Sequence, residues 1–291
     1  MLSRLGVVLL WLLHGLPLPL LAAIGRGLGW LLFHLMQHRR HIVEVNLALC
    51  FPELDDTQRR QLALAHFKVL ARSLLERGVL WWSRPARLQR LIRVEGAETI
   101  RRLLDQGRPV MVLAPHFVGL DAGGVGMSMR FDCVSLYAEQ SNKVFDRLIY
   151  RGRRRFGDQL LLSRQEGVRS IVRAMKGGYL FYYLPDVNVR ARDSLFVPFF
   201  GVPTATVTGL SRLSRLTGAA VFSCVTRMLP GGQGYVVEVG PVWENYPTDD
   251  VEADTRRMNA AIEDAVRTMP EQYYWVHRRF KTRPPGEPPL Y

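Results

Sequence analysis

His116 and Asp121 are the residues whose types and spacing best suit catalysis. They stand five positions apart, directly after a run of apolar residues. A carboxylate that accepts a hydrogen bond from one imidazole nitrogen fixes the tautomer, and the other nitrogen can then take a proton from a hydroxyl group. Such a pair is the base-and-orienter half of a serine-protease triad, with the attacking oxygen supplied by the substrate.

The spacing of this pair is weak evidence when it is taken alone. With 7 histidines and 26 acidic residues in 291, about 0.6 matches to this spacing are expected by chance. No other histidine has an acid at the same distance, and His116 also follows a predicted buried strand. Ligands of open parallel sheets bind beyond the carboxyl ends of strands. From the residues alone, a catalytic base and a structural histidine capped by a carboxylate both remain open.

The elements that must position this pair alternate between strands and helices. Apolar runs are typical of strands buried on both faces, and the amphipathic stretches between them predict helices. The predicted strands are 109–114, 133–138, 179–184, 219–226 and 235–239, and the predicted helices are 58–82, 96–106, 119–129, 142–156, 166–175, 208–216 and 251–268. This alternation predicts an α/β fold with a mostly parallel central sheet and helices on both faces.

The N-terminal segment is predicted to anchor the chain to a membrane. Residues 5–25 carry no formal charge and, as a helix, would be long enough to cross a hydrocarbon core of ~30 Å. Pro17 and Pro19 would kink that helix, so a helix in the membrane surface or a re-entrant pair of helices stays open. A cleaved signal peptide fits poorly because apolar residues resume after Arg26. We expect an anchor at 1–37 and a second domain at 38–291.

The charge balance favours polyanionic partners. The chain has 39 Lys and Arg against 26 Asp and Glu, a formal net charge of +13. This excess suits an anionic membrane surface or an acidic protein. Nucleic acid is disfavoured because the basic residues are dispersed and no nucleic-acid-binding motif is present. Arg39 and Arg40 follow the apolar segment, which favours a cytoplasmic location for the rest of the chain.

Several blocks resemble the His-x4-Asp glycerolipid acyltransferase superfamily. They are His116 to Asp121, Leu184-Pro185-Asp186 and Val197-Pro198-Phe199-Phe200-Gly201. The apolar N-terminus, Arg39-Arg40, Asn46-Leu47, Cys50-Phe51-Pro52 and the tail from Tyr274 to Gly286 narrow this likeness to the lipid A secondary acyltransferases of lauroyl and myristoyl type. The resemblance covers nearly the whole chain, and the tail block is its most specific part.

This resemblance implies transfer of an acyl chain from an acyl carrier protein thioester to a hydroxyl of a lipid A precursor. It implies His116 as general base, Asp121 as its catalytic partner, and an acyltransferase domain at 38–291. The enzyme would work on the cytoplasmic face of the bacterial inner membrane, without a metal or cofactor. Five further residues would bind substrate or order the site: Arg153, Arg154, Arg155, Arg164 and Asp186. For each arginine, a solvated helix face is the alternative.

Three questions stay open at this level. Val197–Gly201 is either a loop packed in the core or a wall of an acyl groove. Val187-Asn188-Val189 departs from the histidine or glutamine that many relatives have after the Pro-Asp pair. The rival functions are acyl transfer to another lipid, such as a glycerophospholipid, ornithine lipid or glycolipid, and a non-catalytic basic module that is tethered to a membrane and binds polyanions.

Overall fold

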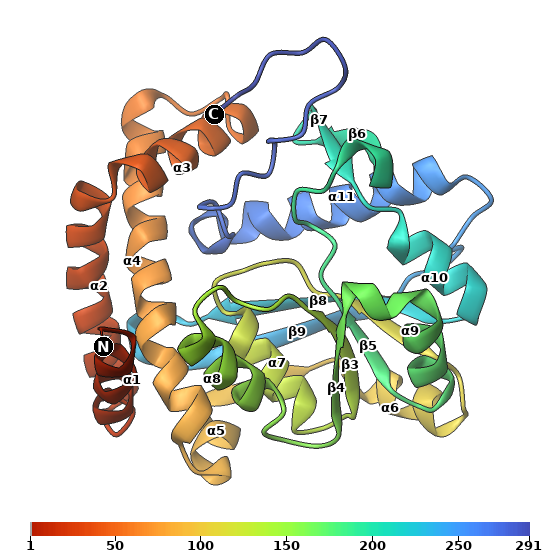
Figure 1. The fold of residues 1–291 in the computed structure, drawn as a ribbon, viewed down its shortest axis with the longest axis horizontal. Helices are drawn as coiled ribbons and strands as arrows, with labels where there is room; N and C mark the ends of the chain where they lie inside the picture. The colour runs from red at the N-terminus through yellow and green to blue at the C-terminus, as the bar shows by residue number, and fades with distance from the viewer. Residues whose placement is uncertain (1) are drawn as a thin grey trace.

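The computed structural model describes residues 2–291, apart from the side chains of Leu2 and Arg164. A seven-stranded sheet in the order β1-β9-β8-β2-β5-β3-β4 forms its centre, with helices packed around it (Figure 1). Neighbouring strands pair in parallel except β8 and β9, which are antiparallel. Two separate hydrophobic clusters surround this sheet, one on each face. The predicted α/β class and mostly parallel sheet are confirmed.

The element bounds match most of the predicted ranges to within a few residues. The strands are β1 Ile92–Glu95, β2 Val110–Leu113, β3 Cys133–Tyr137, β4 Gln159–Ser163, β5 Leu180–Tyr183, β6 Leu195–Phe199, β7 Val202–Thr206, β8 Ala220–Met228 and β9 Tyr235–Val242. The helices are α1 Leu2–Leu13, α2 Leu18–Leu35, α3 Gln37–Cys50, α4 Asp56–Trp82, α5 Pro85–Leu91, α6 Glu98–Asp105, α7 Leu120–Ser128, α8 Lys143–Arg153, α9 Gly167–Lys176, α10 Gly209–Thr217 and α11 Val251–Thr268.

The apolar N-terminal stretch forms two helices rather than one. α1 ends at Leu13, and Pro17 caps the start of α2, so the prolines break the helix as their positions predict. Both helices lie along α4 (Figure 1). Gly25 and Gly29 allow this close approach, because a Cβ at either would lie within 2.6 Å of the α4 backbone. Within residues 2–291, α2 is the one helix long and apolar enough to cross a membrane, and it is a candidate anchor.

The segment 197–201 belongs to a hairpin that packs into the core. β6 and β7 form a separate two-stranded antiparallel sheet, and the turn between them contains Phe200 and Gly201, both with positive φ. Val197 and Phe199 are fully buried, and the Phe199 ring contacts those of Tyr273 and Phe280. The hydrophobic-core interpretation therefore holds for these two side chains, rather than a groove wall.

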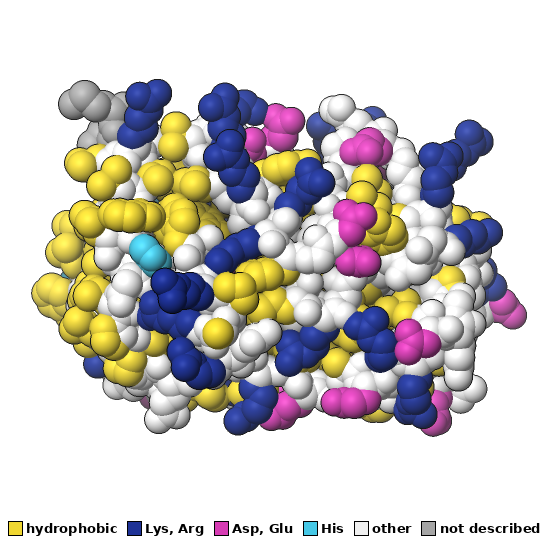
Figure 2. Space-filling view, turned by 90° about the horizontal axis from the view of Figure 1, so that it is seen from below, with side chains coloured by type: hydrophobic (Ala, Val, Ile, Leu, Met, Phe, Trp, Pro, Cys, Tyr) yellow, Lys and Arg dark blue, Asp and Glu magenta, His cyan; other side chains and the backbone are white. Residues whose placement is uncertain are grey.

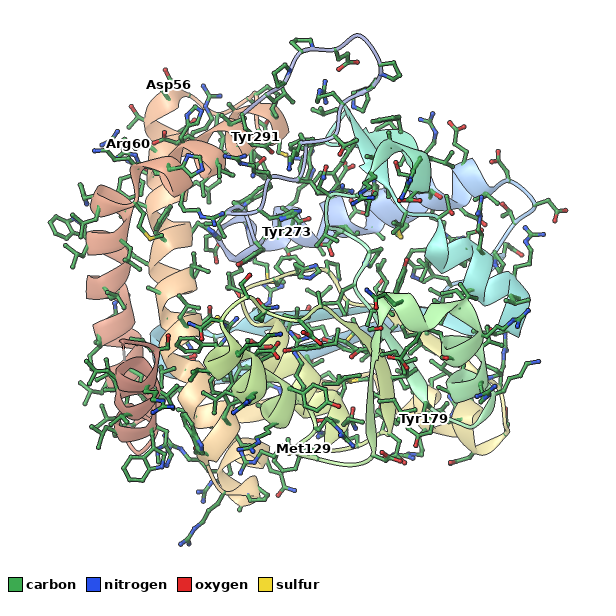
Figure 3. The ribbon with its side chains drawn as sticks, viewed as in Figure 1. Asp56, Arg60, Met129, Tyr179, Tyr273 and Tyr291 are labelled. Atoms are coloured by element: carbon green, nitrogen blue, oxygen red, sulfur yellow. The ribbon has the colours of Figure 1, made fainter. Side chains whose placement is uncertain are left out.

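The C-terminal tail runs back through the centre of the molecule. Figure 3 shows Tyr273 in the interior, between α4 and α11, and Tyr291 close to α3. Asn46 of α3 donates hydrogen bonds to the carbonyls of Trp275 and His277, and its side-chain oxygen accepts one from the Tyr291 hydroxyl. The tail therefore joins the N-terminal helices to the sheet, next to the carboxyl end of β2.

Candidate active site

His116 lies three residues beyond the carboxyl end of β2, where the tail holds its backbone. The carbonyl of His116 accepts a hydrogen bond from the Tyr274 N–H at 2.9 Å. Its neighbour Phe117 pairs with Tyr273 in an isolated antiparallel bridge, and the Val118 N–H donates to the carbonyl of Gln272. The strand end and the tail together fix the backbone from which the imidazole projects.

Asp186 is the carboxylate that contacts His116. The Nδ1 of His116 lies 2.7 Å from Oδ1 of Asp186, and the backbone N–H of His116 donates to Oδ2 at 2.8 Å. Asp186 follows β5, which pairs in parallel with β2, so both residues emerge at the same edge of the sheet. The expected hydrogen bond between His116 and Asp121 is not formed. Sequence reasoning placed Asp186 in the site, as a residue that binds substrate or orders it.

The surroundings of Asp186 keep it ionised. Burial alone would raise the pKa of this carboxyl, since its side chain is fully inaccessible. The nearby His116 imidazole, the two hydrogen bonds from His116 and the buried Arg279 guanidinium outweigh burial and lower the pKa of Asp186 to about 2. A carboxylate that accepts from Nδ1–H leaves Nε2 of His116 as the basic nitrogen. Within the described residues no protein group bonds Nε2, and the side chain is 27% exposed.

Asp121 is held between two arginines at the start of α7. Arg77 of α4 donates from Nε to Oδ2 of Asp121 at 2.8 Å, and Nη2 of Arg153 lies 3.4 Å from Oδ1. Burial would raise the pKa of Asp121, but the two guanidinium charges outweigh it and lower that pKa. The loop after β2 and the start of α7 therefore direct the Asp121 side chain toward α4 and α8 rather than toward His116. Arg77 lies within a long helix, and no sequence signal distinguished it from a solvated helix position.

The predicted basic residues separate into different environments. Arg153 contacts Asp121 and also lies over the ring of Tyr137. Arg154 is exposed and lies over Tyr150 of its own helix. Arg155 donates to the backbone carbonyls of Leu80 and Ser83, so it ties α8 to the end of α4. The prediction for the Arg164 side chain falls outside what the structure describes.

A polar cluster lies beside Asp186. The sequence did not single out its members residue by residue. The buried Arg279 guanidinium donates to the carbonyl of Ala205 and the hydroxyl of Thr206. Nε2 of His277 accepts a hydrogen bond from the Asn188 N–H at 2.9 Å. Burial and the charges of Arg279 and His116 lower the pKa of His277 to about 4, so this imidazole is neutral at pH 7. Both residues belong to the tail block that carried the family resemblance.

Two apolar spaces flank the site, and Leu184 borders both. The first, the inner cavity, has a volume of about 60 Å³ and lies between β3, β4 and helices α4, α7 and α8, with Asp121 and Arg153 in its wall. The second, the open groove, has a volume of about 950 Å³ and lies between α9, α10 and the segment after β5. Leu184 is two residues before Asp186, but His116 and Asp186 line neither space. They border a smaller pocket of about 10 Å³, together with Asn46, Tyr273 and His277.

Comparison with known proteins decides what kind of protein carries this site. The model of the bacterial lipid A biosynthesis acyltransferases matches residues 1–282. The chain belongs to this family. It is 36% identical to the lipid A biosynthesis lauroyltransferase of Escherichia coli (strain K12), over 100% of this chain and 94% of the relative. It is equally similar, at 36%, to the palmitoleoyltransferase of the same strain, over 98% and 93% of the two chains.

This lipid A biosynthesis acyltransferase also matches the Escherichia coli myristoyltransferase, at 30% identity over 92% of the chain and 82% of the relative. The three relatives are named for different acyl groups, and two of them are equally similar to this chain. Overall similarity therefore shows the class of reaction, acyl transfer in lipid A biosynthesis, and leaves the length of the acyl chain open.

Proposed function

We propose that this acyltransferase moves a fatty acyl chain from an acyl carrier protein thioester to a hydroxyl of a lipid A precursor, with His116 as general base. One observation carries the assignment of the base: Nδ1 of His116 is bound by Asp186, whereas no described protein group bonds Nε2 and the side chain is 27% exposed. This geometry makes Nε2 the nitrogen that can take a proton from a substrate hydroxyl. Asp186 is a positioning residue, because it acts through the imidazole.

The reaction then balances in two steps. Nε2 of His116 takes the hydroxyl proton while the oxygen attacks the thioester carbonyl, which gives a tetrahedral oxyanion. Collapse of this intermediate breaks the carbon–sulfur bond, and the imidazolium returns its proton to the leaving thiolate, which yields the ester and the free thiol of the carrier. Asp186 stays ionised throughout, because its low pKa favours stabilisation of the imidazolium over proton transfer.

Asp121 is proposed to act through the two arginines that it holds. One carboxylate and two guanidinium groups leave a net positive charge of about one at the edge of the site. A fixed positive charge near the reacting carbonyl stabilises the oxyanion, and guanidinium groups also bind phosphate well. Arg153 is therefore proposed to bind substrate, with Arg154 and the Arg164 position as further basic contacts. Arg155 is bound to backbone carbonyls, and we propose a structural role for it.

The N-terminal helices are proposed to bring this site to the membrane. Apolar side chains crowd the side of the molecule formed by α1 and α2, at the left of Figure 2. The large exposed hydrophobic residues there are Leu5, Val8, Leu9, Trp11, Leu12, Leu20, Ile24, Trp30, Leu31 and Leu35. An apolar surface of this kind suits insertion into a lipid bilayer. We propose residues 1–37 as the anchor, an anionic inner membrane as its target, and residues 38–291 as the catalytic domain on the cytoplasmic face.

The proposal is tested by a transfer assay with the purified full-length protein. The donors are acyl carrier protein thioesters and the matching coenzyme A thioesters, and the acceptors are a tetra-acylated lipid A precursor and a lysophospholipid. We expect transfer from the carrier thioester to the lipid A precursor. Transfer only to the lysophospholipid would refute the acceptor, and equal use of coenzyme A would refute the carrier as the specific donor. Unchanged lipid A in a strain that lacks the gene would also contradict the assignment.

A further inference from the structure

The open groove reaches the catalytic edge of the sheet through the segment that holds Asp186. Pro185 and Val187, the two neighbours of Asp186 in the chain, line the groove. Val187 also lines the small pocket that is bordered by His116 and Asp186. Because one side chain borders both spaces, the inner end of the groove lies beside the reacting groups.

From this inner end the groove runs along α10. One face of this helix forms its wall over roughly 10 Å, through Gly209, Arg212, Leu213 and Leu216. The start of α10 lies against the end of β5, since a Cβ at Gly209 would collide with the Tyr183 hydroxyl. Leu216, at the other end of this wall, is 59% exposed. The groove is therefore elongated and leads from the catalytic edge to the outer surface of the molecule.

The wall of the groove carries polar groups that are available for a ligand. Arg190 and Arg212 line it, and neither guanidinium has a hydrogen bond or ion pair with any residue that the structure describes. The Thr208 hydroxyl and the side-chain NH₂ of Asn188 likewise have no partner among those residues. Asp193, the acidic residue in the wall, is ion-paired with the arginine before it. Two positive charges in the groove are therefore uncompensated.

The order of these groups matches a linear arm that carries a phosphate. An acyl carrier protein presents its thioester on a phosphopantetheine arm, which has a phosphate at its outer end and amide groups between the phosphate and the sulfur. Guanidinium groups bind phosphate, and hydroxyl and NH₂ groups bond to amides. Arg212 lies one turn into α10 and Arg190 four residues after Asp186, so both stand away from the inner end. Asn188 and Thr208 lie closer to it.

The position of the groove favours a soluble partner over a lipid. α9 and α10, which form its walls, lie at the right of Figure 1, whereas the apolar helices α1 and α2 lie at the left. If α1 and α2 enter the membrane, the groove opens toward the aqueous phase. α9 also presents Arg169, Arg173 and Lys176 to solvent, which suits the approach of an acidic protein.

We propose that the open groove binds the phosphopantetheine arm of the acyl carrier protein, with Arg190 and Arg212 on its phosphate and the thioester beside Val187. This inference rests on the proposed function, since it takes the carrier thioester as donor. The carrier itself lies against the exposed faces of α9 and α10. The segment Val187-Asn188-Val189, which departs from many relatives, forms part of the wall that faces the arm.

Kinetics with charge-removing variants test the phosphate contacts. Arg190→Gln and Arg212→Gln should each raise KM for the carrier thioester about tenfold, because each removes a charge-assisted hydrogen bond. kcat should stay within about threefold, since the phosphate lies away from the reacting carbonyl. Arg108→Gln is the matched control: it removes the same charge from an exposed position before β2, at the opposite edge of the sheet, and should leave KM unchanged. A wild-type KM in the double variant would overturn the inference.

A labelling experiment tests the arm site without catalysis. Cys50, Cys133 and Cys224 are all buried, so Val187→Cys adds one accessible thiol at the inner end of the groove. The probe is phosphopantetheine with a bromoacetyl group on its sulfur, and the introduced thiolate displaces bromide to form a thioether. We expect labelling at least about tenfold faster than with the same reagent without its phosphate. Ala260→Cys, at an exposed position of α11, should react equally with both reagents.

The outcomes separate this inference from the proposed function. Equal rates with the two reagents at Val187→Cys would overturn the arm site. Protection from labelling by the lipid A precursor, and not by carrier protein with its arm attached, would overturn it as well, because the groove would then hold the acceptor. Phosphate-dependent labelling without transfer from any thioester would refute the proposed function and leave the arm site standing.

Discussion

Asp186→Asn should inactivate the acyltransferase by changing the tautomer of His116. In the wild type, one carboxylate oxygen accepts from the backbone N–H of His116 and the other accepts from Nδ1–H. Asparagine has only one oxygen. If that oxygen keeps the backbone hydrogen bond, the amide NH₂ faces Nδ1, which must then accept, so the imidazole proton moves to Nε2. Nε2 loses its lone pair as a base.

The size of the effect follows from the same contacts. A general base contributes about 100-fold to 10,000-fold to a reaction, and the wrong tautomer removes this contribution. We therefore expect kcat to fall by at least about 100-fold. The site lowers the pKa of Asp186 from 3.8 to about 2, which corresponds to about 2 kcal/mol of preference for the charged form. The loss of stability should be of that order or smaller.

The assay combines turnover with a direct view of the imidazole. Steady-state kinetics give kcat and KM, and ¹⁵N NMR of histidine-labelled protein reports which nitrogen of His116 carries the proton. Asp121→Asn is the matched control, because it removes a carboxylate that contacts Arg77 and Arg153 rather than His116. It should leave the tautomer unchanged. The reasoning is refuted if Asp186→Asn keeps the proton on Nδ1, or if Asp121→Asn changes the tautomer instead.

Three further outcomes are expected from other contacts. Burial lowers the pKa of His66 to about 4, so the unfolded state binds more protons between pH 6.5 and 4. Because of His66, the free energy of unfolding of the wild type falls by about 3 kcal/mol as the pH falls from 6.5 to 4, and above pH 6.5 His66 causes no such loss. Denaturant titrations of His66→Asn should lack this part of the pH dependence. Arg155→Met should lower the melting temperature while kcat changes less than about threefold, because Arg155 binds backbone carbonyls; a large loss of kcat in a stable protein would contradict this role. Gly29→Val should separate α2 from α4 and destabilise the fold by about 1–3 kcal/mol, measured by chemical denaturation, and a wild-type midpoint would show that the two helices do not pack closely.

Hydrophobic periodicity was sufficient to predict five of the seven strands of the central sheet and most of its helices, whereas the two edge strands, β1 and β4, were missed. The runs that became β2 and β5 are buried on both faces, as expected for central strands of a covered parallel sheet. β1, with its charged Arg93 and Glu95, lies at the edge of the sheet and lacks this signal. The hairpin β6–β7 was also missed, because Pro198 and Pro203 argue against strands in sequence and are tolerated where each strand has only one partner.

The candidate site was predictable in its location and less so in its pairings. His116 and Asp186 both follow buried strands, and the shared carboxyl edge of the sheet brings them together. Whether Asp121 or Asp186 contacts Nδ1 of His116 depends on the conformation of the loop after β2 and of the C-terminal tail. The spacing of these residues along the chain does not predict which carboxylate it is. Arg77 reaches Asp121 only through the packing of α4, and Arg279 reaches Asp186 only through the fold of the tail. Such contacts arise from tertiary structure.

The role of His116 as the base of an acyl transfer can be measured in the rate of that transfer. Purified wild type, His116→Ala and His116→Gln are compared with a carrier-protein thioester and a lipid A precursor, and circular dichroism checks that each variant is folded. We expect the wild type to transfer the acyl chain and both variants to lose about 100-fold or more in kcat. A folded His116→Ala enzyme with kcat within about threefold of the wild type would contradict it.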